Sequence, residues 1–301
     1  MSPGTATLKG INPQALGLSL LASVLWAAYY PLIVVLPSSA DGVVLVLPFL
    51  FGALPFLALR SRTGPGDPSG ERTPLYAYVV AGIFMMALQL DVIVSTRLVG
   101  AVPTAIFTLL GDVVAIPIIS FLFWREGSQR VLAPKFWVGA IVATVGATLA
   151  IAAGESALPL GWKLAALEIP IPILVGLYFA FVARLTQKVP IQRVVGPVTL
   201  CGFLASLVAL PFLGGLPSFG VLPPLGYVDL LVVGLTTFFV APWAFFEASR
   251  RVSVVIPAVV NATIPIFTMV FMVGFLGAPI YLLALLGIPL AFGGALLAIT
   301  D

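Results

Sequence analysis

Residues 103–127 read PTAIFTLLGDVVAIPIISFLFWREG, and Asp112 is the one ionisable side chain in this run before Arg125. An α-helix of about twenty apolar residues crosses the ~30 Å hydrocarbon core of a bilayer. The stretch therefore predicts a membrane-spanning helix with a carboxylate near its middle. A charged group at that depth costs roughly 2.5–3.5 kcal/mol on insertion scales, so its retention indicates a partner or a water-filled cavity.

The rest of the chain has a similar composition. Of its 301 residues, 61% are hydrophobic and 8% are charged, whereas soluble domains carry roughly 25% charged residues. The apolar runs lack the ~10-residue alternation of β-barrel strands. The single cysteine, Cys201, forms no internal disulfide, and a net charge of +3 does not indicate nucleic acid as a partner. The predicted class is an all-α, polytopic membrane protein whose surroundings are the lipid bilayer.

Breaks at proline, glycine and charged clusters divide the chain into ten apolar runs, each a predicted transmembrane helix. The loops between the runs are too short for a soluble domain, so a single membrane domain is expected. The predicted spans are 14–36, 41–60, 75–97, 101–124, 134–153, 161–184, 194–214, 226–249, 253–276 and 280–299.

The basic residues predict the orientation of these spans. If the N-terminus is cytoplasmic, twelve lysines and arginines fall on the cytoplasmic side, and only Arg97 and Lys163 fall outside. Such a bias is what the positive-inside rule requires. An even number of spans returns the C-terminus to the same side. We therefore expect a multi-pass protein of the cell membrane, inner or plasma, with both termini cytoplasmic.

A weak internal repeat relates the two halves of the chain. With an offset of 154 residues, STRLVGAVPTAIF at 95–107 aligns with SRRVSVVIPAVVN at 249–261. Each half has five predicted spans, and an odd number forces the halves into opposite orientations. The expected arrangement is a first five-helix repeat at 1–153 and a second, inverted repeat at 154–301. Inverted repeats are common among secondary transporters, where the solute site lies near the bilayer midplane between the halves.

This arrangement resembles the drug/metabolite transporter superfamily, and its EamA-type members in particular. The resemblance rests on LDVIVSTRLVGAVPTAIFTLLGDVVAIPIISFLFWREG and on EASRRVSVVIPAVVNATIPIFTMVFMVGFLG, each followed by a Gly-rich span. Family members typically end the fourth and ninth spans with an acid after an FLG-like turn. Glu126 fits this place, whereas the ninth span ends in FLGAP and lacks the acid. The resemblance implies outward transport of a small organic solute, such as an amino acid, a metabolite or a drug, through a central cavity.

Asp112 is the first candidate for the chemistry of that cavity. Thr104, Thr108 and Asp112 are four residues apart, so they share one helix face. This polar stripe is expected to face the bundle interior, where Asp112 would bind a proton or a cation. The alternative is a neutral, hydrogen-bonded carboxylic acid at a helix contact.

Prolines accompany several of the polar side chains within the spans. Proline lacks an N–H group and, within a helix, leaves the carbonyl four residues earlier without its donor. Such backbone is tolerated in a membrane only where protein or water satisfies it, which again indicates a cavity. Proline is also common in membrane helices, which accounts for any one case. The expected pairs are Pro117 with Val113, Pro172 with Glu168 and Pro265 with Asn261.

Two other acids leave alternatives open. Asp91 is either a cavity residue or an interfacial acid paired with Arg97. Glu247 and Arg251 are spaced i, i+4 in the favourable order, which predicts a structural ion pair at the cytoplasmic end.

Aromatic residues occur beside these acids in the spans. The candidates are Trp26, Tyr30, Tyr178 and Trp243. Aromatic faces near carboxylates suit a cationic or amphipathic organic solute, and the alternative is ordinary core packing. The predicted spans 134–153 and 280–299 are Gly-rich and free of acids, so they are expected at the periphery.

The residues that are absent exclude several kinds of chemistry. The chain has no histidine, no nucleophile elbow and no phosphate-binding loop. We therefore predict no catalytic residue, no metal site and no cofactor, and we expect a secondary transporter rather than an enzyme. An intramembrane enzyme would need Asp112 paired with Glu168 or Asp91, and a non-transporting scaffold would need no polar cavity. The predicted solute-binding or coupling residues are Trp26, Tyr30, Asp91, Thr108, Asp112, Glu168, Tyr178, Trp243 and Asn261.

Overall fold

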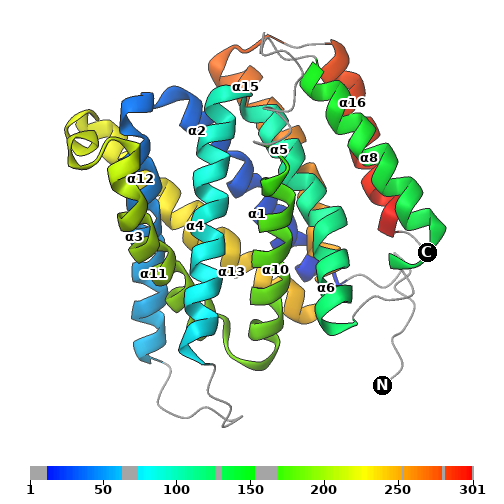
Figure 1. The fold of residues 1–301 in the computed structure, drawn as a ribbon, viewed down its shortest axis with the longest axis horizontal. Coiled ribbons are helices and arrows are strands. Elements are labelled where there is room, and N and C mark those ends of the chain that lie inside the picture. Colours follow the sequence, from blue (N-terminus) through cyan, green and yellow to red (C-terminus); the bar gives the residue numbers. More distant parts are fainter. Residues whose placement is uncertain are drawn as a thin grey trace.

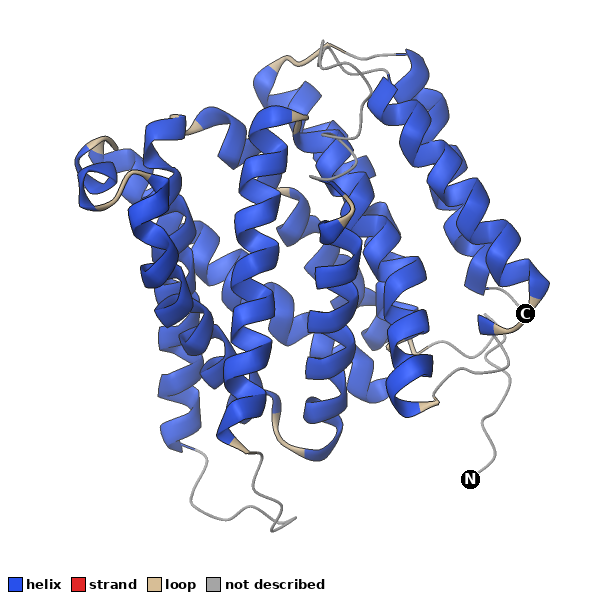
Figure 2. Ribbon diagram, in the orientation of Figure 1, coloured by secondary structure: helices blue, strands red, loops and turns tan. Residues whose placement is uncertain are grey.

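The computed structural model describes residues 12–62, 74–125, 131–152, 168–252, 254–279 and 282–299. These residues form helices joined by short turns, with no strand among them (Figures 1 and 2). The longer helices are α1 (Pro13–Ala27), α2 (Tyr29–Val35), α3 (Asp41–Arg62), α4 (Leu75–Leu98), α5 (Ala101–Leu110), α6 (Ile116–Trp124), α8 (Pro134–Ala152), α10 (Pro170–Lys188), α11 (Ile191–Ala209), α12 (Pro224–Leu235), α13 (Ala241–Arg251), α14 (Val255–Val260), α15 (Ile264–Leu276) and α16 (Leu282–Ile299).

Short 3₁₀ and π segments connect or interrupt these helices. They are η2 (Ser38–Ala40), η3 (Gly111–Ala115), η4 (Leu210–Leu213), η5 (Leu216–Gly220), η6 (Thr236–Val240) and η7 (Asn261–Thr263).

Eight helical stretches among the described residues are long and apolar enough to cross a membrane, which makes the chain a polytopic membrane protein as predicted. For the predicted runs 134–153 and 280–299, the structure has the apolar helices α8 and α16. Residue Glu126 and residues 153–167 lie outside the described part of the chain. The eight stretches are Pro13–Val35, Ser38–Leu59, Leu75–Leu98, Ala101–Trp124, Pro170–Gln187, Ile191–Leu213, Pro224–Arg251 and Val255–Leu276.

The helices pack around a core built from distant parts of the chain. Helix α1 contacts α13 and α15, α4 contacts α10 and α11, and α3 contacts α11 and α12. Figure 1 shows α4 and α10 in front of α13. The core is rich in buried aromatic residues, among them Phe49, Phe238, Phe245 and Phe246. Residues from both halves of the chain therefore form one continuous interior.

Helices α8 and α16 form a closely packed pair at one side of the molecule (Figure 1). A Cβ atom built on Gly139 would lie 2.3 Å from the backbone nitrogen of Ala298, and one on Gly294 would lie 2.3 Å from that of Ala143. Small residues at such positions let the backbones approach closely, as is usual between membrane helices. The glycines expected in these two segments thus serve helix packing.

Ion pairs lie near the ends of the helices. The Nη2 atom of Arg97 is 2.8 Å from Oδ1 of Asp41, which joins the ends of α4 and α3. Arg97 therefore has Asp41 as its partner, and not Asp91. The predicted pair of Glu247 and Arg251 is present, with Nη2 and Oε1 separated by 2.8 Å.

Candidate functional site

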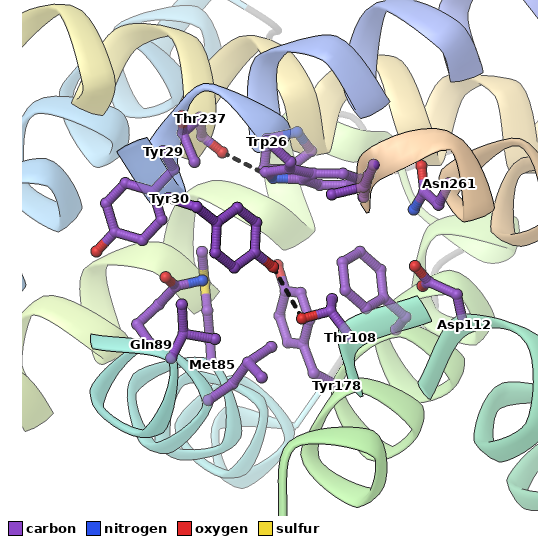
Figure 3. A pocket seen from close by; sticks show the side chains of 15 residues that line it. Trp26, Tyr29, Tyr30, Met85, Gln89, Thr108, Asp112, Tyr178, Thr237 and Asn261 are labelled. Atoms are coloured by element: carbon purple, nitrogen blue, oxygen red, sulfur yellow. Dashed lines mark hydrogen bonds between the residues drawn. The ribbon is translucent and has the colours of Figure 1, made fainter. Parts of the chain in front are cut away.

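A small cavity lies among α1, α2, α4, α5, η3, α10, η6, α13, η7 and α15 (Figure 3). Its free volume is about 50 Å³, which holds a few water molecules and is too small for an organic solute. The lining combines aromatic rings with a few polar groups. The lining residues are Trp26, Tyr29, Tyr30, Met85, Leu88, Gln89, Val92, Thr108, Asp112, Tyr178, Phe179, Thr237, Pro242, Asn261 and Ile264.

A π-helical turn places Asp112 at this cavity. In η3 the N–H of Ile116 bonds to the carbonyl of Gly111, five residues earlier. In that register the next donor is residue 117, which is a proline and has no N–H. The main chain thus offers the carbonyl of Asp112 neither the usual i+4 donor nor the i+5 donor. The sequence argument named the carbonyl of Val113, whose i+4 residue is Pro117; the π-turn leaves the carbonyl of Asp112 without a main-chain donor as well.

A second π-helical turn has the same construction. In η6 the N–H of Ala241 bonds to the carbonyl of Thr236, and residue 242, the next i+5 position, is a proline. The carbonyl of Thr237 instead accepts a hydrogen bond from the indole nitrogen of Trp26, at 3.1 Å. The Thr237 hydroxyl donates to the carbonyl of Leu25 at 3.2 Å. Two hydrogen bonds therefore lock α1 to the interrupted helix at the cavity wall.

This arrangement predicts that Trp26→Phe lowers stability. The substitution keeps an aromatic ring but leaves the Thr237 carbonyl without its donor inside the protein. The expected loss is about 1–2 kcal/mol, since unpaired buried carbonyls are costly and hydrogen bonds in membranes contribute modestly. Thermal unfolding of the purified protein in detergent measures it. Trp137→Phe, at a side chain that is 48% exposed on α8, is the control. Equal melting of the two variants would contradict the role of the indole.

The other two prolines differ from each other. At η7 the N–H of Ile264 bonds to the carbonyl of Asn261. That carbonyl is therefore paired through a 3₁₀ bond, and the expectation that Pro265 leaves it free was wrong. Pro172 falls in the first turn of α10 and supplies no N–H to the carbonyl of Glu168.

The middle of the cavity holds a hydroxyl pair. Tyr30 Oη and Thr108 Oγ1 are 2.8 Å apart (Figure 3). The Thr108 hydroxyl also lies 3.1 Å from the carbonyl of Thr104, to which it donates. The Tyr30 hydroxyl is thus the donor toward Thr108, because a threonine hydroxyl has one hydrogen. The pair joins α2 to α5.

Asp112 and Asn261 face each other across one end of the cavity (Figure 3). Asp112 is 1% exposed, and neither of its carboxyl oxygens has a hydrogen-bond partner within the described structure. The amide nitrogen of Asn261 is also without an acceptor, while its oxygen accepts from Ser23 Oγ at 2.9 Å. Asn261 is thereby oriented with its donor free. A carboxylate and an amide N–H group without partners, both facing a cavity, form an incomplete site that a proton, water or solute completes.

Aromatic rings close another side of the cavity. Trp26 makes an edge-to-face contact with Phe179 at 5.3 Å between ring centroids, and Tyr178 contacts Phe179 at 4.8 Å. The Tyr178 hydroxyl is buried without a partner. Ring faces and a free hydroxyl beside a carboxylate are suited to an organic cation.

Six of the nine predicted residues line this cavity: Trp26, Tyr30, Thr108, Asp112, Tyr178 and Asn261. The other three do not. Trp243 lies on α13 with 38% of its surface exposed. Asp91 and Glu168 lie between α4 and the start of α10, where Asp91 acts electrostatically on Glu168. The structure thus separates these two acids from the lining of the central cavity.

The sequence argument missed Tyr29, Gln89 and Thr237, which also line the cavity. The Tyr29 hydroxyl and the Gln89 side-chain oxygen are buried without partners. Pro242 could have indicated Thr237, because it comes five residues after Thr237 just as Pro117 comes five residues after Asp112. Nothing in the sequence distinguished Tyr29 or Gln89 from residues on other faces of their helices.

The fold, with its long apolar helices around this cavity, defines a multi-pass α-helical membrane protein. The model of the EamA-like transporter family matches residues 169–300, so that part of the chain is similar to this family of membrane transporters. The match confirms the resemblance to the drug/metabolite transporter superfamily.

One solved crystal structure, described only as that of a protein, superposes with a TM-score of 0.67 at 17% identity. The match covers 95% of this chain and 95% of that one. At this identity the likeness concerns the fold alone. No curated protein matches the chain.

Proposed function

We propose that the protein is a secondary transporter that moves a small organic solute by alternating access, with Asp112 as the coupling group. The observation that carries the proposal is the buried Asp112 carboxyl, which faces the free amide donor of Asn261 across the cavity. An ionisable side chain without a partner inside a membrane-spanning helix costs free energy. Its retention therefore indicates a function. The family match to EamA-like transporters supports transport as that function.

The cavity supports a solute that carries a positive charge or an amine. Trp26, Tyr30, Tyr178 and Phe179 supply ring faces, and Asp112 supplies the negative charge. When such a solute binds, its charge stabilises the ionised carboxyl and so displaces the proton. Solute and proton therefore compete for one group, which is the simplest form of exchange. Export follows if an inward proton gradient drives the reaction.

The free volume of about 50 Å³ requires the helices to separate before a solute enters. In our proposal the chain has ten spans, formed by an inverted repeat of five at 1–153 and five at 154–301. Relative rocking of the two halves would open the cavity to each side in turn. The interruptions at η3, η6 and η7 lie at the cavity, where they are suited to act as hinges. The charge bias supports cytoplasmic termini in the cell membrane.

Flux measurement in proteoliposomes tests the proposal. Vesicles containing a trapped pH indicator are exposed to amino acids, polyamines and amphipathic cations. We expect at least one member of the panel to cross the membrane and to move protons in the opposite direction, as protein-free vesicles do not. Folded, reconstituted protein that passes no member of the panel would contradict the proposal.

A further inference from the structure

A second group of unpartnered polar atoms lies outside the central cavity, between α4 and the start of α10. Glu168 precedes α10 and has 0% of its surface exposed, yet neither carboxyl oxygen has a hydrogen-bond partner in the described structure. Oδ2 of Asp91 is likewise buried and unpartnered, and Asp91 is close enough to act electrostatically on Glu168. Two neighbouring carboxylates in a buried place cannot both stay ionised at low cost.

Ser95 supplies an independent indication of a site. It is one helical turn after Asp91 on α4, it is fully buried, and its hydroxyl lies near the Glu168 carboxyl, on which it acts, without a partner at normal hydrogen-bond geometry. Several buried serines elsewhere in the described structure donate to a main-chain carbonyl three or four residues earlier, as Ser19 and Ser249 do at 2.7 and 2.9 Å. Ser95 does not make this bond. Its hydrogen is thus available to the acid.

We infer that Asp91, Glu168 and Ser95 form a second proton site, in which the two carboxyl groups share one proton. The proton neutralises one of the two neighbouring acids, and the Ser95 hydroxyl donates to an oxygen of Glu168. A metal ion would need more ligands: the described residues contain no cluster of three or more acidic, histidine or cysteine side chains. Hard cations such as Ca²⁺ take about six to eight oxygen ligands.

The charges around this site favour a proton shared by two acids. Arg97, the basic residue at the end of α4, is paired with Asp41 at 2.8 Å. From α2, the Tyr30 hydroxyl lies within electrostatic range of both Glu168 and Asp112. Tyr30 is also bonded to Thr108, so this hydroxyl pair lies within electrostatic range of both Glu168 and Asp112.

This position gives the second site a role that rests on the proposed function. A proton held by Asp91 and Glu168 passes to a hydroxyl oxygen, and the hydroxyl proton passes on to the Asp112 carboxylate, through cavity water where needed. The balance is that Glu168 loses one proton and Asp112 gains one. The acid pair would then load Asp112 from the side of the membrane on which α10 begins.

Infrared difference spectroscopy of the purified protein, recorded between acid and alkaline pH, tests the site without any solute. The wild type should show protonated-carboxyl bands, and Glu168→Gln should remove one that the Asp112→Asn variant retains. Asp91→Asn should retain the band and move its midpoint to lower pH, because the neighbouring charge is gone. Ser95→Ala should shift the band frequency, since one hydrogen bond to the acid is lost. Asp229→Asn, on α12, is the matched control and should change nothing.

Three outcomes would overturn the inference: protonated-carboxyl bands that Glu168→Gln leaves unchanged, a midpoint of the Glu168 band unchanged by Asp91→Asn, or displacement of that band by NaCl at constant pH. Displacement by NaCl would identify a metal cation instead of a proton. If Glu168→Gln fails to fold, Asp91→Asn and Ser95→Ala still decide the question. The Asp112→Asn variant should retain the Glu168 band. The infrared result on Glu168 therefore does not depend on solute flux, so the second proton site and the proposed transport function can be refuted independently.

Discussion

Asp112→Asn abolishes the accumulation of solute against its gradient when a pH difference is the only driving force. The substitution keeps the shape of the side chain and removes its ionisable proton. With one proton exchanged per solute, a pH difference of one unit sustains about a tenfold solute gradient, because 1.4 kcal/mol corresponds to a factor of ten. The variant should only equilibrate the solute across the membrane. Flux in proteoliposomes at fixed internal pH and varied external pH measures this.

Asp229→Asn is the control for this experiment. Asp229 lies on α12 and is absent from the cavity lining, so the same chemical change there should preserve accumulation and its pH dependence. Thermal unfolding of both variants verifies the fold. If Asp112→Asn kept a tenfold, pH-driven gradient, Asp112 would be a structural group that completes the contact with Asn261.

Gly294→Leu should strongly destabilise the pair formed by α8 and α16. A Cβ atom at this position would lie 2.3 Å from the nitrogen of Ala143 and 2.7 Å from the carbonyl oxygen of Gly139. Both are backbone atoms, so the helices must separate to accommodate the side chain. Overpacking in cores typically costs about 1–3 kcal/mol, and a leucine against backbone should reach or exceed the upper value. Unfolding in detergent and the yield of monodisperse protein measure the effect.

Gly293→Leu provides a control at the adjacent residue. A Cβ atom on Gly293 would meet nothing within 4 Å, and leucine is the better helix former by roughly 0.8 kcal/mol. This variant should match or exceed the wild type in stability. Equal loss of stability in both variants would indicate that position 294 is sensitive for a reason other than the close approach of the two helices.

Much of the site was predictable because polar residues are rare in such a chain. Asp112 and Asn261 stand out among apolar neighbours, and a buried polar group in a membrane needs a partner or a cavity. The prolines also indicated where the helices are interrupted, although not the type of interruption. A π-turn at η3 and a 3₁₀ turn at η7 pair different carbonyls from those expected of a kinked α-helix.

The rotation of each helix about its own axis was not predictable from the sequence. Thr237 faces the cavity, whereas Trp243, six residues later, is partly exposed on α13. The residue inserted by the π-turn at η6 rotates everything after it by about 100° relative to a continuous helix. Asp91 likewise lies outside the cavity lining and acts electrostatically on Glu168, while Gln89 on the same helix lines the cavity.

The sequence by itself determined the class of the protein, the position of most spans and the polar residues available within them. These are local properties, since the thickness of the bilayer sets the length of each run and the cost of burying charge makes acids conspicuous. Only the tertiary structure decided which residue each acid has as its neighbour. Asp112 faces Asn261 across the cavity, Glu168 lies near Asp91, and Asp41 binds Arg97. The reason is physical, because those pairings depend on contacts between helices far apart in the chain, which no local pattern encodes.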